Sequence, residues 1–180
     1  MRDIVPRLTL LAAAAFTIAA ATSGCSTQTV SPPRGPLEVR SSTIEICYPA
    51  SSLPGLIGAG LLIATNPVTV ESVTLTDPVG VTNPNSYLVT NAGGKGIGSA
   101  RDPLPADVEA DFGVARWESK REAAGATIEP GDPGQQLILK VAGTAGTASG
   151  ILVRYTSNGF SYDLQIPQRT KIQEPTCAST

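Results

Sequence analysis

Residues 150–167 constrain the fold of this chain more than any other stretch, and they read GILVRYTSNGFSYDLQIP. Asn158-Gly159 between alternating apolar residues is a strong hairpin signal, because a type I′ turn needs positive φ at both central positions. One register separates the pairs into two faces. Its apolar face pairs Ser157 with Phe160, Tyr155 with Tyr162, Val153 with Leu164 and Ile151 with Ile166, and its other face pairs Thr156 with Ser161, Arg154 with Asp163 and Leu152 with Gln165. Cross-strand energetics favour apolar pairs inside and an opposite-charge pair outside, so the sequence predicts this hairpin.

Further segments alternate apolar and polar residues over the length of a strand. Residues 135–143 place Leu137, Leu139 and Val141 on one face, after a turn rich in Pro and Gly. Residues 68–77 form another predicted strand, in which the apolar phase slips and so predicts a bulge near Glu71-Ser72. Shorter strand-like segments are residues 40–49, 60–66 and 86–91.

These segments predict an all-β fold. No long stretch has a 3.6-residue period, and the 18 glycines and 15 prolines mark frequent turns. Residues 113–123 (GVARWESKREA) fit a short helix and a strand equally well. Seven or more short strands predict an antiparallel β-sandwich over residues 38–180, for which the Greek-key, immunoglobulin-like topology is the commonest arrangement.

The N-terminus has the layout of an export signal. Basic residues precede the uncharged run 8–21, which is too short for a comfortable transmembrane helix. Ser23-Gly24-Cys25 resembles the end of a bacterial lipobox, in which the cysteine is acylated and becomes the mature N-terminus, although Thr22 replaces the usual leucine. The alternative is ordinary signal-peptidase cleavage at Ala19-Ala20-Ala21, which would leave Cys25 without a role.

The residues after Cys25 favour the lipoprotein interpretation. They are rich in Ser, Thr and Pro and have no hydrophobic periodicity, which is typical of a tether. We therefore expect a signal peptide over residues 1–24, a tether over residues 25–37, and a domain held on the extracytoplasmic face of the membrane. Acyl chains such as palmitate contribute about 0.8 kcal/mol per buried CH₂, and two chains anchor stably.

Removing Cys25 from the count leaves two cysteines, Cys47 and Cys177, near the two ends of the predicted domain. In a chain exported to an oxidising compartment, an even number of cysteines favours a disulfide over two buried thiols. Such a bridge would close a loop of almost the whole domain.

Composition argues against several classes of function. The chain contains no histidine, and its only methionine is Met1. If the two remaining cysteines are bridged, the chain lacks the commonest general base and the thiolate nucleophile, so we expect no enzyme, no cofactor and no transition-metal site. The mature chain keeps 11 basic and 14 acidic side chains, which gives no basic patch for nucleic acid.

Two neighbouring segments are candidate binding loops. Residues 91–103 contain four glycines around Lys95 without the P-loop pattern, so we favour a long loop over a phosphate site. The next residues gather four carboxylates, Asp102, Asp107, Glu109 and Asp111. They could contribute to a calcium site, which needs six to eight oxygens, but the EF-hand pattern is absent and a solvated acidic loop is the favoured interpretation.

Trp117 is the only tryptophan, and we expect it to pack in the core rather than to form a sugar-binding platform. From Leu61 to Cys177 the chain resembles a group of exported actinobacterial immunoglobulin-like lipoproteins of uncharacterised function. The similar elements are Asn66 before a V-x-V strand, Trp117, the turn Thr127-Ile128-x-Pro130-Gly131, the hairpin Tyr155…Gly159…Tyr162, and Cys177. The resemblance implies fold and location, and it brings no catalytic residue or ligand.

The function expected from the sequence is non-catalytic binding at the cell envelope, with an envelope protein, a polysaccharide or a small ligand held at residues 91–111. A structural or assembly component of an envelope complex is the alternative. A glycan-processing enzyme that uses carboxylates among Asp107, Glu109 and Asp111 is a distant third.

Overall fold

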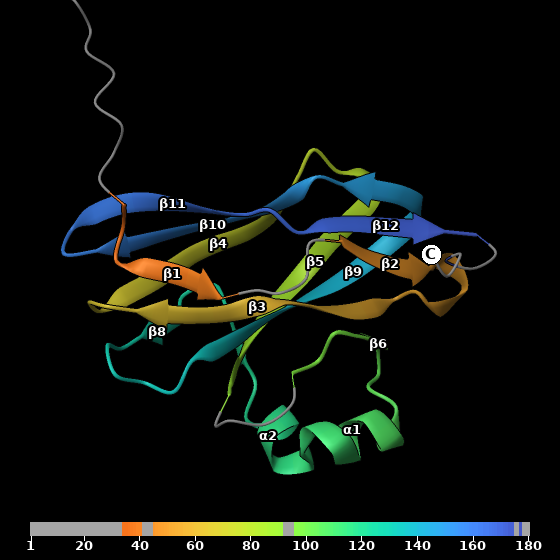
Figure 1. The fold of residues 1–180 in the computed structure, drawn as a ribbon, viewed down its shortest axis with the longest axis horizontal. Coiled ribbons are helices and arrows are strands. Elements are labelled where there is room, and N and C mark those ends of the chain that lie inside the picture. The colour runs from red at the N-terminus through yellow and green to blue at the C-terminus, as the bar shows by residue number, and fades with distance from the viewer. Residues whose placement is uncertain (1–33, 41–44, 92–95, 175–176, 178–180) are drawn as a thin grey trace, which may run out of the picture. The chain divides into compact units, whose positions relative to one another are not determined.

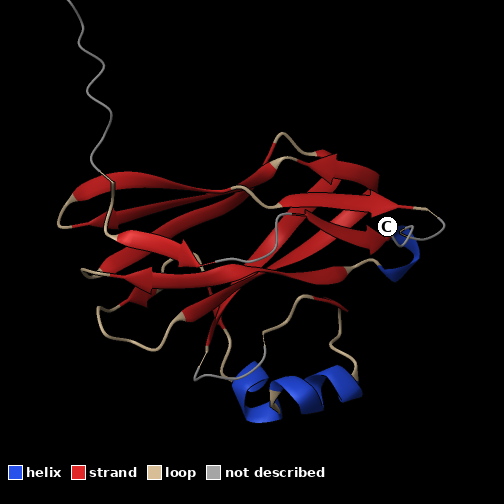
Figure 2. Ribbon diagram, in the orientation of Figure 1, coloured by secondary structure: helices blue, strands red, loops and turns tan. Residues whose placement is uncertain are grey.

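A computed structural model describes residues 34–40, 45–91, 96–174 and 177. These residues form two packed, mostly antiparallel sheets with two short helices against the outer face of the larger sheet (Figures 1 and 2). The predicted all-β sandwich is confirmed, and the immunoglobulin-like topology stays a prediction. In the part of the chain that the structure describes, no helix has the length and apolar character needed to cross a membrane.

The large sheet is built around β9, the longest strand. On one edge β9 pairs with β5, and on its other edge it pairs first with β3 and then with β12. The strands β1 and β6 each pair antiparallel with β3, and β7 pairs antiparallel with β5. The strand β2 pairs with β12 and runs parallel to it. The bounds are β1 Leu37–Arg40, β2 Glu45–Pro49, β3 Gly55–Ala64, β5 Val79–Thr90, β6 Ser99–Arg101, β7 Arg121–Glu122, β9 Gln135–Ala148 and β12 Arg169–Gln173.

The small sheet has the order β11-β10-β4-β8. Its strands are β4 Val68–Thr76, β8 Thr127–Ile128, β10 Gly150–Ser157 and β11 Phe160–Ile166. All seven predicted pairs of the β10–β11 hairpin are confirmed, with φ of 51° at Asn158 and 79° at Gly159. The predicted bulge is confirmed too, because Tyr155 pairs with Val70 and Arg154 with Ser72, which leaves Glu71 without an opposite residue.

The main core lies between the two sheets and is made of side chains from alternate strand positions. Burying one such aliphatic side chain contributes about 1.5–3 kcal/mol to folding. Its largest fully buried members are Ile57, Leu62, Leu88, Ile128, Leu137, Leu139, Ile151, Tyr155, Ile166 and Ile172.

A second cluster covers the opposite face of the large sheet. Leu56 and Ile138 point into it, whereas their chain neighbours Ile57 and Leu139 point into the main core. The helices α1 (Ala106–Phe112) and α2 (Val114–Glu118) supply Phe112 and Trp117 to this cluster. Trp117 is therefore buried as expected, but on the outer face of the sheet rather than between the sheets.

Two sequence interpretations are corrected by these helices. The acidic segment was expected to be a loop, but Asp107, Glu109 and Asp111 lie on α1. The ambiguous residues 113–123 form α2 followed by β7, so each alternative holds for part of the segment.

The two ends of the domain are fixed by contacts. The predicted disulfide between Cys47 and Cys177 is confirmed, with a Cα–Cα distance of 5.8 Å. It joins β2 to the segment after β12, across 130 residues of sequence. At the other end, the predicted tether ran through Leu37, but Leu37 is buried and begins β1. A one-turn 3₁₀ helix (Ala50–Ser52) follows β2.

Candidate functional site

The four predicted carboxylates do not converge. Asp102 forms an ion pair with Lys140, with 2.6 Å between Oδ2 and Nζ. The hydrogen bond to Asp102, together with its charge, raises the pKa of Lys140 above the ordinary value. Asp102 is thereby committed to a contact with β9. Among the described residues, no group of three or more acidic, Cys or His side chains could hold a metal ion.

Asp107 and Asp111 do share a site. They lie one helical turn apart on α1 and line a groove with a volume of about 290 Å³. Glu109 lies two residues from each of them, so it projects from a different side of the helix. The other lining residues are Gly96, Ile97, Gly98, Ser99, Val108 and Phe112.

The wall of the groove opposite α1 is fixed by a side-chain amide. Gln136 Nε2 donates to the Ile97 carbonyl at 2.8 Å, and the Ile97 N–H donates to Gln136 Oε1 at 3.1 Å. The Gly58 N–H donates to the Gly98 carbonyl at 2.9 Å, which brings residues 96–98 flat against β3. The remaining residues of the predicted glycine-rich loop, including Gly93, Gly94 and Lys95, lie outside the described residues.

Arg116, a residue of α2, joins this helix to the end of β5. Its Nε donates to the Thr90 carbonyl at 2.8 Å, its Nη2 donates to Asn91 Oδ1 at 2.7 Å, and its guanidinium lies 4.2 Å from the centre of the Phe112 ring. Burial lowers the pKa of Arg116 from its ordinary value.

Trp117 is enclosed by the same cluster. Its ring meets Tyr87 and Phe112 edge-on, and Lys120 Nζ lies 4.7 Å from the ring centre. Trp117 is 9% exposed as a whole residue, so its ring forms no open stacking surface for a sugar.

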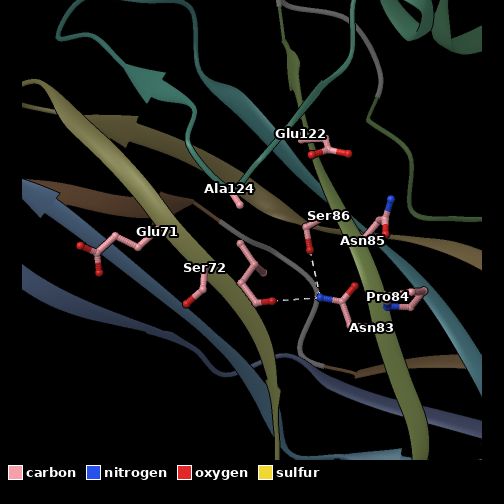
Figure 3. Close-up of a pocket in the computed structure, with 9 residues that line it drawn as sticks. Glu71, Ser72, Asn83, Pro84, Asn85, Ser86, Glu122 and Ala124 are labelled. Carbon is pink, nitrogen blue, oxygen red and sulfur yellow. Dashed lines mark hydrogen bonds between the residues drawn. The ribbon is translucent and has the colours of Figure 1, made fainter.

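A second hollow was not anticipated from the sequence. It has a volume of about 210 Å³ and opens where the two sheets separate, between β4 of the small sheet and β5 and β7 of the large one (Figure 3). Its lining residues are Glu71, Ser72, Val73, Asn83, Pro84, Asn85, Ser86, Glu122 and Ala124. We call it the inter-sheet pocket.

Both principal walls of the inter-sheet pocket are irregular. Glu71 is the bulged residue of β4. On the opposite wall, the partner of β5 moves only from Ala142 to Lys140 while β5 advances from Thr82 to Asn85, so β5 also carries an extra residue. Bulges redirect side chains and are over-represented beside functional sites.

Asn83 bridges the two walls. Its Nδ2 donates to the Val73 carbonyl at 3.1 Å and to Ser86 Oγ at 2.9 Å (Figure 3). Its Oδ1 is buried and has no hydrogen-bond partner. The Glu71 carboxylate points away from Asn83, and none of the lining residues is basic. The pocket therefore offers acceptors at Asn83 Oδ1 and Glu122, beside serine hydroxyls and the Asn85 amide, which can both donate and accept.

A sequence signal for the inter-sheet pocket did exist on both walls. The phase slip at Glu71 marked one bulge, and Pro84 lies within β5, where a proline is typical of a bulge or a strand edge. No local sequence pattern indicated that these two irregular positions, on β4 and β5 of different sheets, face each other across the sandwich.

Comparison of the chain with protein-family models, with curated proteins and with solved structures finds no match. The roles assigned to the groove and to the inter-sheet pocket below rest on their residues and geometry.

Proposed function

We propose that this chain is a cell-envelope lipoprotein, anchored through Cys25 to the extracytoplasmic face of the membrane, whose sandwich acts by non-catalytic binding. The N-terminal sequence supports the anchor, because an apolar run ends in Ser23-Gly24-Cys25 and a Ser/Thr/Pro-rich segment follows. The Cys47–Cys177 disulfide supports export, since such bridges persist in oxidising compartments.

Binding is favoured over catalysis by the side chains available. The sequence has no histidine, and its two cysteines beyond the lipobox are bonded to each other. These facts leave carboxylates as the main candidates for acid–base chemistry.

The observation that carries the binding proposal is the inter-sheet pocket, where two bulged strands surround an Asn83 oxygen without a partner. Ser72, Asn85 and Ser86 add side chains that can donate or accept, and Glu122 adds a further acceptor. These groups complement a ligand rich in hydroxyls, which both donate and accept, so an envelope polysaccharide is the ligand class that we propose. A site built on strands also holds its geometry more rigidly than one built on loops.

Intact mass of the protein purified from native membranes tests the anchor. We expect a chain that begins at Cys25 and carries a diacylglycerol group, and that gains two hydrogens on reduction. An unlipidated mass that begins at or before Ser23 would mean a freely secreted domain.

Retention on insoluble polysaccharide from the envelope of the producing cell tests the pocket. We expect Glu122→Gln and Asn85→Ala each to weaken retention about tenfold, as for loss of one hydrogen bond that involves a charge or a well-placed amide. Asp107→Asn, in the groove, is the matched control and should bind normally. Normal binding by both pocket variants would contradict this assignment.

The groove beside α1 supports the alternative role of a structural or assembly component. It combines the apolar side chains of Ile97, Val108 and Phe112 with the two aspartates, which suits a protein partner better than a sugar. A stoichiometric partner that co-purifies with the wild-type protein and is lost from Val108→Asp would favour this role.

The enzyme hypothesis now concerns mainly Asp107 and Asp111, because Glu109 does not line the groove. Replacing Asp107, Glu109 and Asp111 by their amides tests it. Unchanged behaviour of this triple variant on envelope glycans would dispose of it.

A further inference from the structure

Two large apolar side chains are conspicuously exposed in the described part of the chain, Phe160 at 66% and Val79 at 67%. Phe160 lies at one end of the small sheet, and Val79, the first residue of β5 in the large sheet, lies near the other end of the sandwich. Phe160 follows the hairpin turn, at the end where Thr156 of β10 pairs with Thr69. Val79 follows Thr76, which pairs with Gly150 at the far end of the same two strands.

The chain enters the domain beside the hairpin. The Leu37 N–H donates to Tyr155 Oη at 3.4 Å. Gly35 lies so close to the Tyr155 hydroxyl and the Tyr162 ring that a Cβ there would collide with both. Tyr155 and Tyr162 form the pair two positions from Ser157–Phe160 at the tip. The described part of the chain therefore begins next to the hairpin tip (Figure 1).

The length of the preceding segment limits how far this end can lie from a bilayer. Cys25 and Gly35 are ten positions apart, with nine residues between them. Fully extended, this stretch spans at most about 36 Å, and a flexible chain of that length averages roughly 18 Å. If Cys25 carries lipid, the hairpin tip therefore lies within reach of the membrane surface.

The tip has the chemistry of a surface that contacts lipid. Its residues from Thr156 to Tyr162 carry no charge, and the adjoining turn at residues 65–67 is also uncharged. That turn is joined to the tip by Ser157 Oγ, which donates to the Pro67 carbonyl at 2.7 Å. Aromatic side chains are favourable at the membrane–water interface, and Arg34, exposed beside Gly35, suits anionic headgroups.

We propose that the β10–β11 tip, through Phe160, rests on the bilayer and orients the domain, with the opposite end around Val79 displayed away from the membrane. This inference rests on the proposed lipid anchor at Cys25. It assigns a lipid surface as the partner of one end of the sandwich, separate from the inter-sheet pocket and the groove.

Fluorescence of the mature, lipidated protein in vesicles of phosphatidylcholine and phosphatidylglycerol tests the proposal. The variants are Phe160→Trp and its matched control Val79→Trp, with the wild type giving the constant emission of Trp117. When brominated acyl chains replace the ordinary ones, we expect the added emission of Phe160→Trp to fall about twofold, because an interfacial indole lies near the bromines. The added emission of Val79→Trp should not change.

Equal quenching at the two positions, or no added quenching at position 160, would overturn the orientation. A lipidated mass together with that result would leave the proposed anchor intact. An unlipidated mass of the membrane-purified protein would overturn both. Both sites are exposed, and matching thermal unfolding of the two variants would exclude a folding defect as the cause of any difference.

Discussion

Tyr155 of the small sheet accepts a hydrogen bond from the first residue of β1, and the pKa of its hydroxyl is higher in the folded protein than in the unfolded chain. Burial raises the pKa of Tyr155 above its ordinary value of 10.0, while the hydrogen bond from the Leu37 N–H acts in the opposite direction. Burial also raises the pKa of Tyr48. The folded protein therefore holds these protons more tightly than the unfolded chain.

The pH dependence follows from that difference. The stability contributed by the protonated tyrosines is fully present below pH 10 and is lost as the pH rises through the folded-state pKa. We expect the urea midpoint to fall above about pH 10, and Tyr155→Phe to make that fall shallower. The variant also loses the contact with Leu37, which lowers stability at pH 7 by about 1 kcal/mol. Identical alkaline slopes in the two proteins would contradict the assignment.

Gly58 is the residue that lets the groove wall lie against the sheet. A Cβ at this position would collide with the carbonyl oxygen of Ile97, which is backbone and cannot rotate away. We expect Gly58→Ala to lower the free energy of unfolding by about 1–3 kcal/mol, as for overpacking in a core. Gly98→Ala is the matched control, since a Cβ there meets nothing within 4 Å. Its unfolding free energy should stay within about 0.5 kcal/mol of the wild type.

At the scale of elements, the β10–β11 hairpin depends on its two turn residues. Gly159 has a φ of 79°, and a Cβ there would contact nothing within 4 Å. Gly159→Ala therefore isolates backbone strain, and we expect a loss of about 1–2 kcal/mol in the free energy of unfolding. Asn158→Gly, at a φ of 51°, should be close to neutral because glycine accepts positive φ. Equal costs in urea unfolding would contradict the assignment of the Gly159→Ala loss to backbone strain.

The elements that could be predicted are those whose determinants are close in sequence. The hairpin register follows from one turn and seven facing pairs, and the β4 bulge follows from a slip in apolar phase. The helix α1 was not predicted, and α2 was only one of two alternatives, because these helices are 7 and 5 residues long and are held by distant partners. Arg116, for example, reaches back to Thr90 and Asn91, and Trp117 packs on Tyr87.

The candidate sites, too, could be predicted only where their residues are close in sequence. Asp107 and Asp111 were grouped as possible ligand residues, with a solvated acidic loop as the favoured interpretation, and they do line one groove. Asp102 was grouped with them, but it forms an ion pair with Lys140 of β9 and does not line the groove. The inter-sheet pocket depends on the approach of β4 to β5, which no local pattern specifies.

At the scale of the whole molecule, the Cys47–Cys177 disulfide links the edge strand β2 to the end of the chain. Without it, β2 would be held to the rest of the large sheet mainly by five parallel pairs with β12. In the chain-entropy account, a bridge across 130 residues stabilises the folded state by about 4–5 kcal/mol. We therefore expect a reductant to lower the urea midpoint of the wild-type protein strongly. The double variant Cys47→Ala/Cys177→Ala should have the urea midpoint of the reduced wild type, and the reductant should not change it. A reduced wild type that keeps its original midpoint would mean that packing of β2 and β12, rather than the bridge, closes this end of the sandwich.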